Sequence, residues 1–148
     1  MTTVLESLAD VLNRPVSPAD RDRARAHLRD WIACAALGAA APVGAILARA
    51  VAHEPPGPCG LLTGERAGPM AAAYVNGGLG GADEMDDLHR AAILHPGPVV
   101  IPAAIAAAEA TDAPPDRLLD AIIRGYEAAC RIGATAGPSH YAHHHNTS

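Results

Sequence analysis

Alanine dominates the apolar stretches of this chain and limits what it can fold into. It occupies 34 of the 148 positions, whereas phenylalanine is absent and only one tryptophan and three tyrosines occur. Alanine has the highest intrinsic helix propensity, and strands are usually rich in the β-branched and aromatic residues that are scarce here. We therefore predict an all-α fold in which small side chains let the helices pack closely.

Proline and hydroxyl residues mark where the helices should begin. One of the two N-terminal threonines can cap a short helix up to about Asn13, and Ser17 followed by Pro18 starts a second helix that reaches about Gly38. Further helices are expected at about 42–53, 70–79, 99–110 and 116–134, with a Pro- and Gly-rich loop at 54–68 that could hold a short extended piece and an irregular tail at 137–148. No internal repeat or long linker is present, so we predict a single helical domain over residues 1–148.

The charged residues exclude several functions. All 11 basic residues are arginines, the net charge is −5, and no basic run occurs, so we expect no nucleic-acid partner. Without lysine, the chain cannot form a Schiff base itself.

The cysteines and the longest uncharged stretch bear on location. Cys34, Cys59 and Cys130 are far apart and form no CxxC pair, which is typical of reduced thiols in a cytoplasmic protein. Acidic residues near the N-terminus interrupt the apolar segment that a signal peptide needs. Residues 31–48 carry no charge, but they are mostly Ala and Gly and Pro42 interrupts them. We predict two buried helices there and no membrane partner.

Chemically active side chains concentrate after the glycine-rich segment at 77–81. Within thirteen residues lie Asp83, Glu84, Asp86, Asp87, His89 and His95. Such a set can supply both a proton acceptor and a proton donor. His95 stands between Leu94 and Pro96, where a rigid apolar turn should hold it and partly desolvate it. The alternative is an acidic helix end with exposed charges and one structural histidine.

The C-terminal tail holds the other histidine cluster, His140 and His143–His145 with Tyr141. Three adjacent histidines cannot all face one ion from a regular helix or strand, so we predict no metal site. A loop that faces substrate or an interface fits better, and a remnant of an affinity tag is a further alternative.

Four segments of the chain match motifs of one family in that family's order. Residues 25–38 (RAHLRDWIACAALG) resemble an LLDxLACxxxG helix, and residues 71–77 (AAAYVNG) resemble AAxxNG. Asp-Asp-Leu-His at 86–89 with His-Pro-Gly at 95–97 resembles DDTH…HPS, and residues 122–133 resemble AxxxGYExxxRIG. The family is MmgE/PrpD, which includes 2-methylcitrate dehydratase, cis-aconitate decarboxylase and iminodisuccinate epimerase.

The resemblance implies a bundle of about six helices like the first part of the family's helical domain. Residues 143–147 (HHHNT) resemble the family's GFHxT segment, and the chain stops there. The smaller α/β lid and the family's catalytic lysine would follow that segment, so we expect both to be missing here. Three positions depart from the family pattern: Gly81 replaces a histidine, Glu84 an aspartate and Leu88 a threonine.

The resemblance also implies roles in proton chemistry on a small carboxylic acid. His95 is the candidate base or acid, and Asp86, Asp87 and Glu84 would orient it or bind polar substrate groups. The candidate substrate-binding residues are His89, Asn76, His145 and Thr147. Dehydration, decarboxylation and epimerisation by proton transfer need neither a metal nor an organic cofactor.

Three functions remain open on the sequence. The first is the small subunit of a split MmgE/PrpD-like lyase, completed by a second chain or by self-association. The second is a stand-alone dehydratase, isomerase or cyclase of specialised metabolism, suggested by the changes at Gly81, Glu84 and Leu88. The third is a non-catalytic helical interaction module. In each case a third of a helical domain leaves apolar faces uncovered, so we expect association.

Overall fold

The computed structural model describes residues 2–139, and helices make up most of them. In chain order the elements are α1 (Val4–Leu12), α2 (Pro18–Ala40), α3 (Pro42–Ala50), β1 (Cys59–Gly60), β2 (Arg66–Ala67), α4 (Pro69–Gly80), α5 (Pro96–Ala110) and α6 (Pro115–Ala136). The prediction of an all-α fold with about six helices is confirmed. The expected extended piece of the 54–68 loop is a two-residue antiparallel pair, in which Cys59 faces Ala67.

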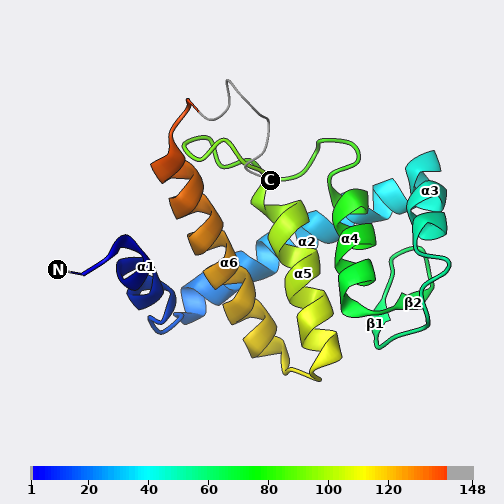
Figure 1. The fold of residues 1–148 in the computed structure, drawn as a ribbon, viewed down its shortest axis with the longest axis horizontal. Helices are drawn as coiled ribbons and strands as arrows, with labels where there is room; N and C mark the ends of the chain where they lie inside the picture. The colour runs from blue at the N-terminus through cyan, green and yellow to red at the C-terminus, as the bar shows by residue number, and fades with distance from the viewer. Residues whose placement is uncertain (1, 140–148) are drawn as a thin grey trace.

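The long helix α2 runs behind α4, α5 and α6, and contacts all three (Figure 1). Helix α5 lies between α4 and α6, while α1 lies against α6 at one end and α3 lies beside α4 at the other. The core between these helices is apolar. Its largest fully buried side chains are Leu79, Ile101, Ile122, Val75, Pro102 and Cys59.

The predicted helix starts are present as local hydrogen bonds. Thr3 and Glu6 form a capping box on α1, and Ser17 and Asp20 form another on α2. In each box the hydroxyl accepts the backbone N–H three residues later, and the acidic side chain accepts the N–H of the cap.

Several helix boundaries differ from the prediction: α3 ends at Ala50 rather than at about residue 53, and α2 and α6 each end two residues later than expected. Helix α5 begins at Pro96 rather than at Val99, because backbone N–H groups in a first helical turn have no intrahelical acceptor and prolines lose nothing there. Helix α4 spans Pro69–Gly80, close to the predicted 70–79, although three of its last four residues, Gly77, Gly78 and Gly80, are glycines. Tertiary contacts override the low helix propensity of glycine at these positions.

Those contacts are close approaches that leave no room for a side chain. A Cβ atom on Gly80 would lie 2.3 Å from Nε1 of Trp31, and one on Gly78 would lie 2.9 Å from Cδ1 of Leu47. On α2, a Cβ on Gly38 would lie 2.2 Å from the carbonyl oxygen of Leu79. The small-residue packing predicted from composition is therefore what brings α2 and α4 together.

A part-buried ion pair also joins α2 to α6. Arg21 donates from Nε and Nη2 to the two carboxylate oxygens of Asp120, at 2.7 and 3.0 Å. This contact lowers the pKa of Asp120 below its ordinary value. Between residues 2 and 139, no single helix is long and apolar enough to cross a membrane, and the pair α2 and α3 passes that test only jointly, across an 89° bend.

We expect Gly80→Ala to destabilise the protein by about 1–3 kcal/mol, because the added methyl group must displace the buried indole of Trp31. Urea unfolding followed by circular dichroism measures the change. Gly81→Ala is the matched control, since a Cβ there would meet Pro98 at an ordinary 3.6 Å. Equal stability of the two variants would contradict this account of the helix packing.

Candidate active site

The loop from Gly81 to His95 carries most of the predicted site, and it is folded onto α6. The backbone N–H of His89 donates to the carbonyl of Leu94 at 2.9 Å, which closes the loop into a narrow turn. Ala92 and Leu94 are buried beneath that turn, against the position of Gly133 on α6. The acidic and imidazole side chains of this loop are therefore presented from an anchored backbone.

His95 and Asp86 form the first polar pair of the site. Nδ1 of His95 lies 2.8 Å from Oδ2 of Asp86. The Asp86 side chain is only 4% exposed, whereas that of His95 is 34% exposed. Because an ionised carboxylate only accepts hydrogen bonds, Nδ1 carries the hydrogen and Nε2 is left to exchange a proton with another molecule.

The backbone fixes where this imidazole stands. His95 is the N-terminal cap residue of α5 and precedes Pro96, which restricts it to the extended conformation observed. Its ring is therefore attached to a rigid helix start rather than to a free loop. The sequence expectation of a held and partly desolvated His95 agrees with this placement.

Asp87 points into the protein and joins three helices. Its Oδ1 accepts the backbone N–H of Gly97 on α5 at 2.9 Å. Its Oδ2 accepts the hydroxyl of Tyr126 on α6 at 2.7 Å and lies 2.8 Å from Nδ1 of His27 on α2. A Cβ on Gly97 would lie 2.7 Å from Oδ1, so only glycine fits this contact.

Tyr126 and His27 are the site residues that sequence reasoning missed. Tyr126 falls in the family-like GYE motif of residues 122–133, and its hydroxyl donates to Asp87. Burial and the Asp87 carboxylate raise the pKa of Tyr126, so it remains a neutral donor. The rings of His27 and Tyr126 lie 5.2 Å apart at a tilt of 53°. No local pattern distinguishes His27 from an exposed histidine on a charged helix face.

The other predicted residues lie in different surroundings. His89 accepts the Ala92 N–H at Nδ1, at 3.2 Å, and lines a pocket. The Glu84 side chain is exposed and makes no hydrogen bond or ion pair within residues 2–139, although the Glu84 backbone N–H donates to the Gly81 carbonyl at 3.3 Å. Asn76 is buried on α4, where it accepts from the Leu62 N–H and donates to the Gly60 carbonyl. Its amide groups hold the β1 loop rather than the acidic cluster. His145 and Thr147 lie outside the described residues.

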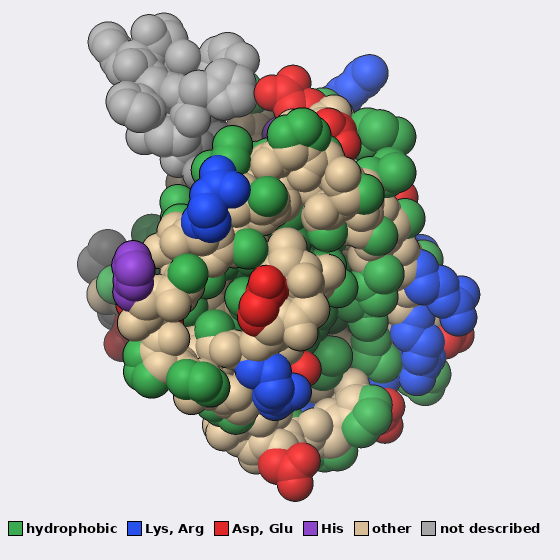
Figure 2. All heavy atoms as spheres, turned by 90° about the vertical axis from the view of Figure 1, so that its right-hand side faces the viewer, with side chains coloured by type: hydrophobic (Ala, Val, Ile, Leu, Met, Phe, Trp, Pro, Cys, Tyr) green, Lys and Arg blue, Asp and Glu red, His purple; other side chains and the backbone are tan. Residues whose placement is uncertain are grey.

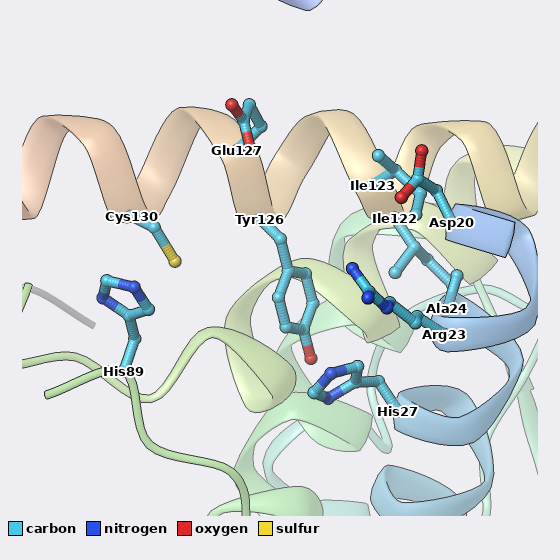
Figure 3. Close-up of a pocket in the computed structure, with 10 residues that line it drawn as sticks. All are labelled: Asp20, Arg23, Ala24, His27, His89, Ile122, Ile123, Tyr126, Glu127 and Cys130. Carbon is cyan, nitrogen blue, oxygen red and sulfur yellow. The ribbon is translucent and has the colours of Figure 1, made fainter. Parts of the chain in front are cut away.

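A pocket of about 280 Å³ opens between α2, α6 and this loop. Arg23 and His27 extend into it from α2, Tyr126 from α6, and His89 lies at the end near Cys130 (Figure 3). The pocket therefore adjoins the contacts that His27 and Tyr126 make with Asp87, whereas His95 and Asp86 are not among the residues that line it. Such an arrangement can bind a small polar molecule beside an imidazole that is available for proton transfer.

The fold and the site define a helical domain that presents a carboxylate-oriented imidazole beside a polar pocket. Residues 7–148 match the MmgE/PrpD N-terminal domain, and the chain belongs to the MmgE/PrpD family. The family resemblance inferred from the sequence is thereby confirmed.

The curated relatives are decarboxylases by name. Cis-aconitate decarboxylase of Aspergillus terreus is 39% identical over 120 residues, which cover 76% of this chain and 24% of the relative. Cis-aconitate decarboxylase-like protein oryM of Aspergillus oryzae is 38% identical over 127 residues, covering 79% and 26% respectively. The chain thus spans about a quarter of the relatives it matches. No solved structure matches it.

We expect Asp87→Asn to lower the free energy of unfolding by about 1–3 kcal/mol, because an amide cannot accept the three hydrogen bonds that meet at this carboxylate. Urea unfolding gives the value. Asp83→Asn is a suitable control, since Asp83 lies exposed in the same loop. A loss no greater than that of the control would show that Asp87 does not hold the helices together.

Proposed function

We propose that this chain supplies the acid/base part of a lyase site, with His95 as the group that moves a proton on a small carboxylic acid. The observation that carries the proposal is the 2.8 Å contact between His95 and the buried Asp86, on a ring that is itself partly exposed. Asp86 orients the imidazole. Asp87 acts indirectly, because it accepts the Gly97 N–H and so positions the start of α5.

The proposed chemistry uses Nε2 of His95, the ring nitrogen that does not contact Asp86. In a decarboxylation, the bond between the carboxylate carbon and its neighbour breaks, carbon dioxide leaves, and Nε2 of protonated His95 donates a proton to the remaining carbanion. In a dehydration, neutral Nε2 removes a carbon-bound proton and hydroxide leaves from the adjacent carbon. Because the protein's part in both reactions is a proton transfer, the proposal includes no metal or organic cofactor. The decarboxylation is favoured by the names of the curated relatives.

The negative charge that develops on the substrate must be stabilised by further groups. Electrostatic stabilisation is usually the largest catalytic contribution, and this chain has no lysine. The exposed Glu84 can contact polar substrate groups but cannot neutralise a carboxylate. We therefore propose that activity requires polypeptide beyond these 148 residues, from a second chain as in a split enzyme or from a second copy.

The uncovered surface supports such association. Met70 and Tyr74 on α4 are 86% and 63% exposed, and Leu5 on α1 is 76% exposed. Figure 2 shows hydrophobic side chains over much of the face at the α3 end, with only a few charged groups between them. Such apolar area is typical of surfaces that contact other proteins.

The unpaired cysteines of the described residues support the cytoplasmic location that we also propose.

The same exposed surface favours a second candidate, a non-catalytic helical interaction module. In that case α1 and α4 would bind another protein, and the His95–Asp86 pair would serve only the fold. A monomeric chain with a cooperative melt would argue against this candidate. A stand-alone dehydratase, isomerase or cyclase differs from both, because the isolated chain would then turn over substrate.

The deciding experiment assays carbon dioxide release from cis-aconitate, using the chain alone and together with any polypeptide that co-purifies with it. His95→Gln should lower turnover by about 10²–10⁴-fold, and Asp86→Asn by less, because it disturbs orientation only. His53→Gln should have no effect, since His53 is exposed beyond α3. Unchanged turnover in His95→Gln would overturn the assignment of His95.

A further inference from the structure

The polar side chains that line the pocket between α2 and α6 differ in whether they already have hydrogen-bond partners within the protein. Asp20 accepts from the Ser17 hydroxyl at 2.7 Å, and Glu127 accepts from Nε of Arg131 at 2.6 Å. Both oxygens of Asp87, behind the pocket wall, are also bonded. Each carboxylate in or next to the pocket therefore already accepts a hydrogen bond from the protein.

The donors in the same pocket are not used in this way. The Arg23 guanidinium makes no hydrogen bond or ion pair with any residue between 2 and 139, although Asp20 acts on it electrostatically. His89 accepts at Nδ1, so its neutral ring carries the hydrogen on Nε2. His27 gives its Nδ1 hydrogen to Asp87, so the Nε2 of its neutral ring is an acceptor, and His27 is not one of the unused donors.

Arg23 and His27 lie one helical turn apart on α2, and both extend into the pocket beneath Tyr126 (Figure 3). His89 approaches from the loop at the other end. A ligand that brings acceptor oxygens would therefore meet donors from two sides. A planar carboxylate suits a guanidinium, which binds it through two parallel hydrogen bonds.

We propose that this pocket is a binding site for a carboxylate group of a small di- or tricarboxylic acid, with Arg23 as the charged donor and His89 as the neutral one. The identity of the ligand class rests on the proposed function, whereas the site itself rests on the pocket and its unused donors. Asp87 contacts both His27 and Tyr126, and adjacent Asp86 contacts His95. The pocket would thus hold the end of the acid that does not react.

Citrate, a tricarboxylate, is the probe for this site, and isothermal titration calorimetry on the 148-residue chain measures its affinity. We expect Arg23→Gln to raise the Kd for citrate by about tenfold or more, because a charge-assisted hydrogen bond is lost. Arg29→Gln removes the same charge from an exposed position of α2 outside the pocket, and should leave the Kd within about twofold of the parent chain. Circular dichroism confirms that both variants are folded.

Two comparisons define what would overturn the site. Equal Kd values for Arg23→Gln and Arg29→Gln would remove Arg23 from it, and sulfate binding as tightly as citrate would reduce it to an unspecific anion site. Normal citrate binding, combined with turnover that is unchanged in His95→Gln when the completing polypeptide is present, would refute the proposed lyase function while leaving the pocket assignment intact.

Discussion

The Asp87 carboxylate is the contact on which the site depends. It accepts hydrogen bonds from α5 and α6 and pairs with a histidine of α2, so one side chain of a loop ties three helices together. The contact is possible because Gly97 has no side chain at the point where the carboxylate meets the start of α5. Since His95 precedes Gly97 by two residues, the position of its imidazole depends on the same bonds.

Adjacent acidic residues divide the work because they face different neighbours. Within residues 2–139, Asp86 is nearly fully buried and bonds to the His95 ring, whereas Asp87 bonds to backbone, phenol and imidazole groups. In our proposal, Asp86 therefore affects proton transfer directly, and Asp87 affects it through the geometry of the helices. Glu84, three residues before Asp87, is exposed and free to contact a ligand. A cluster that looks uniform in sequence thus contains three different functions in our proposal.

Close packing of α4 and α6 against α5 also fixes the start of α5. A Cβ on Gly77 of α4 would lie 2.9 Å from the Pro98 carbonyl, and one on Gly125 of α6 would lie 2.4 Å from Val100. Both contacts involve the first turns of α5. In a chain without phenylalanine, such approaches replace the interlocking of large side chains, and they leave the start of α5 little freedom.

The sequence by itself determined the helices, because alanine content, prolines and the two capping boxes act through local interactions within a few residues. It also identified the family, because that depends on the order of short motifs, and it predicted His95 as the candidate for proton transfer. Only the tertiary structure decided which side chains meet: it placed Asn76 against the β1 loop and brought His27 to Asp87, sixty residues away. The physical reason is that hydrogen bonds between distant segments depend on how helices cross, and residue spacing along the chain carries no record of that crossing.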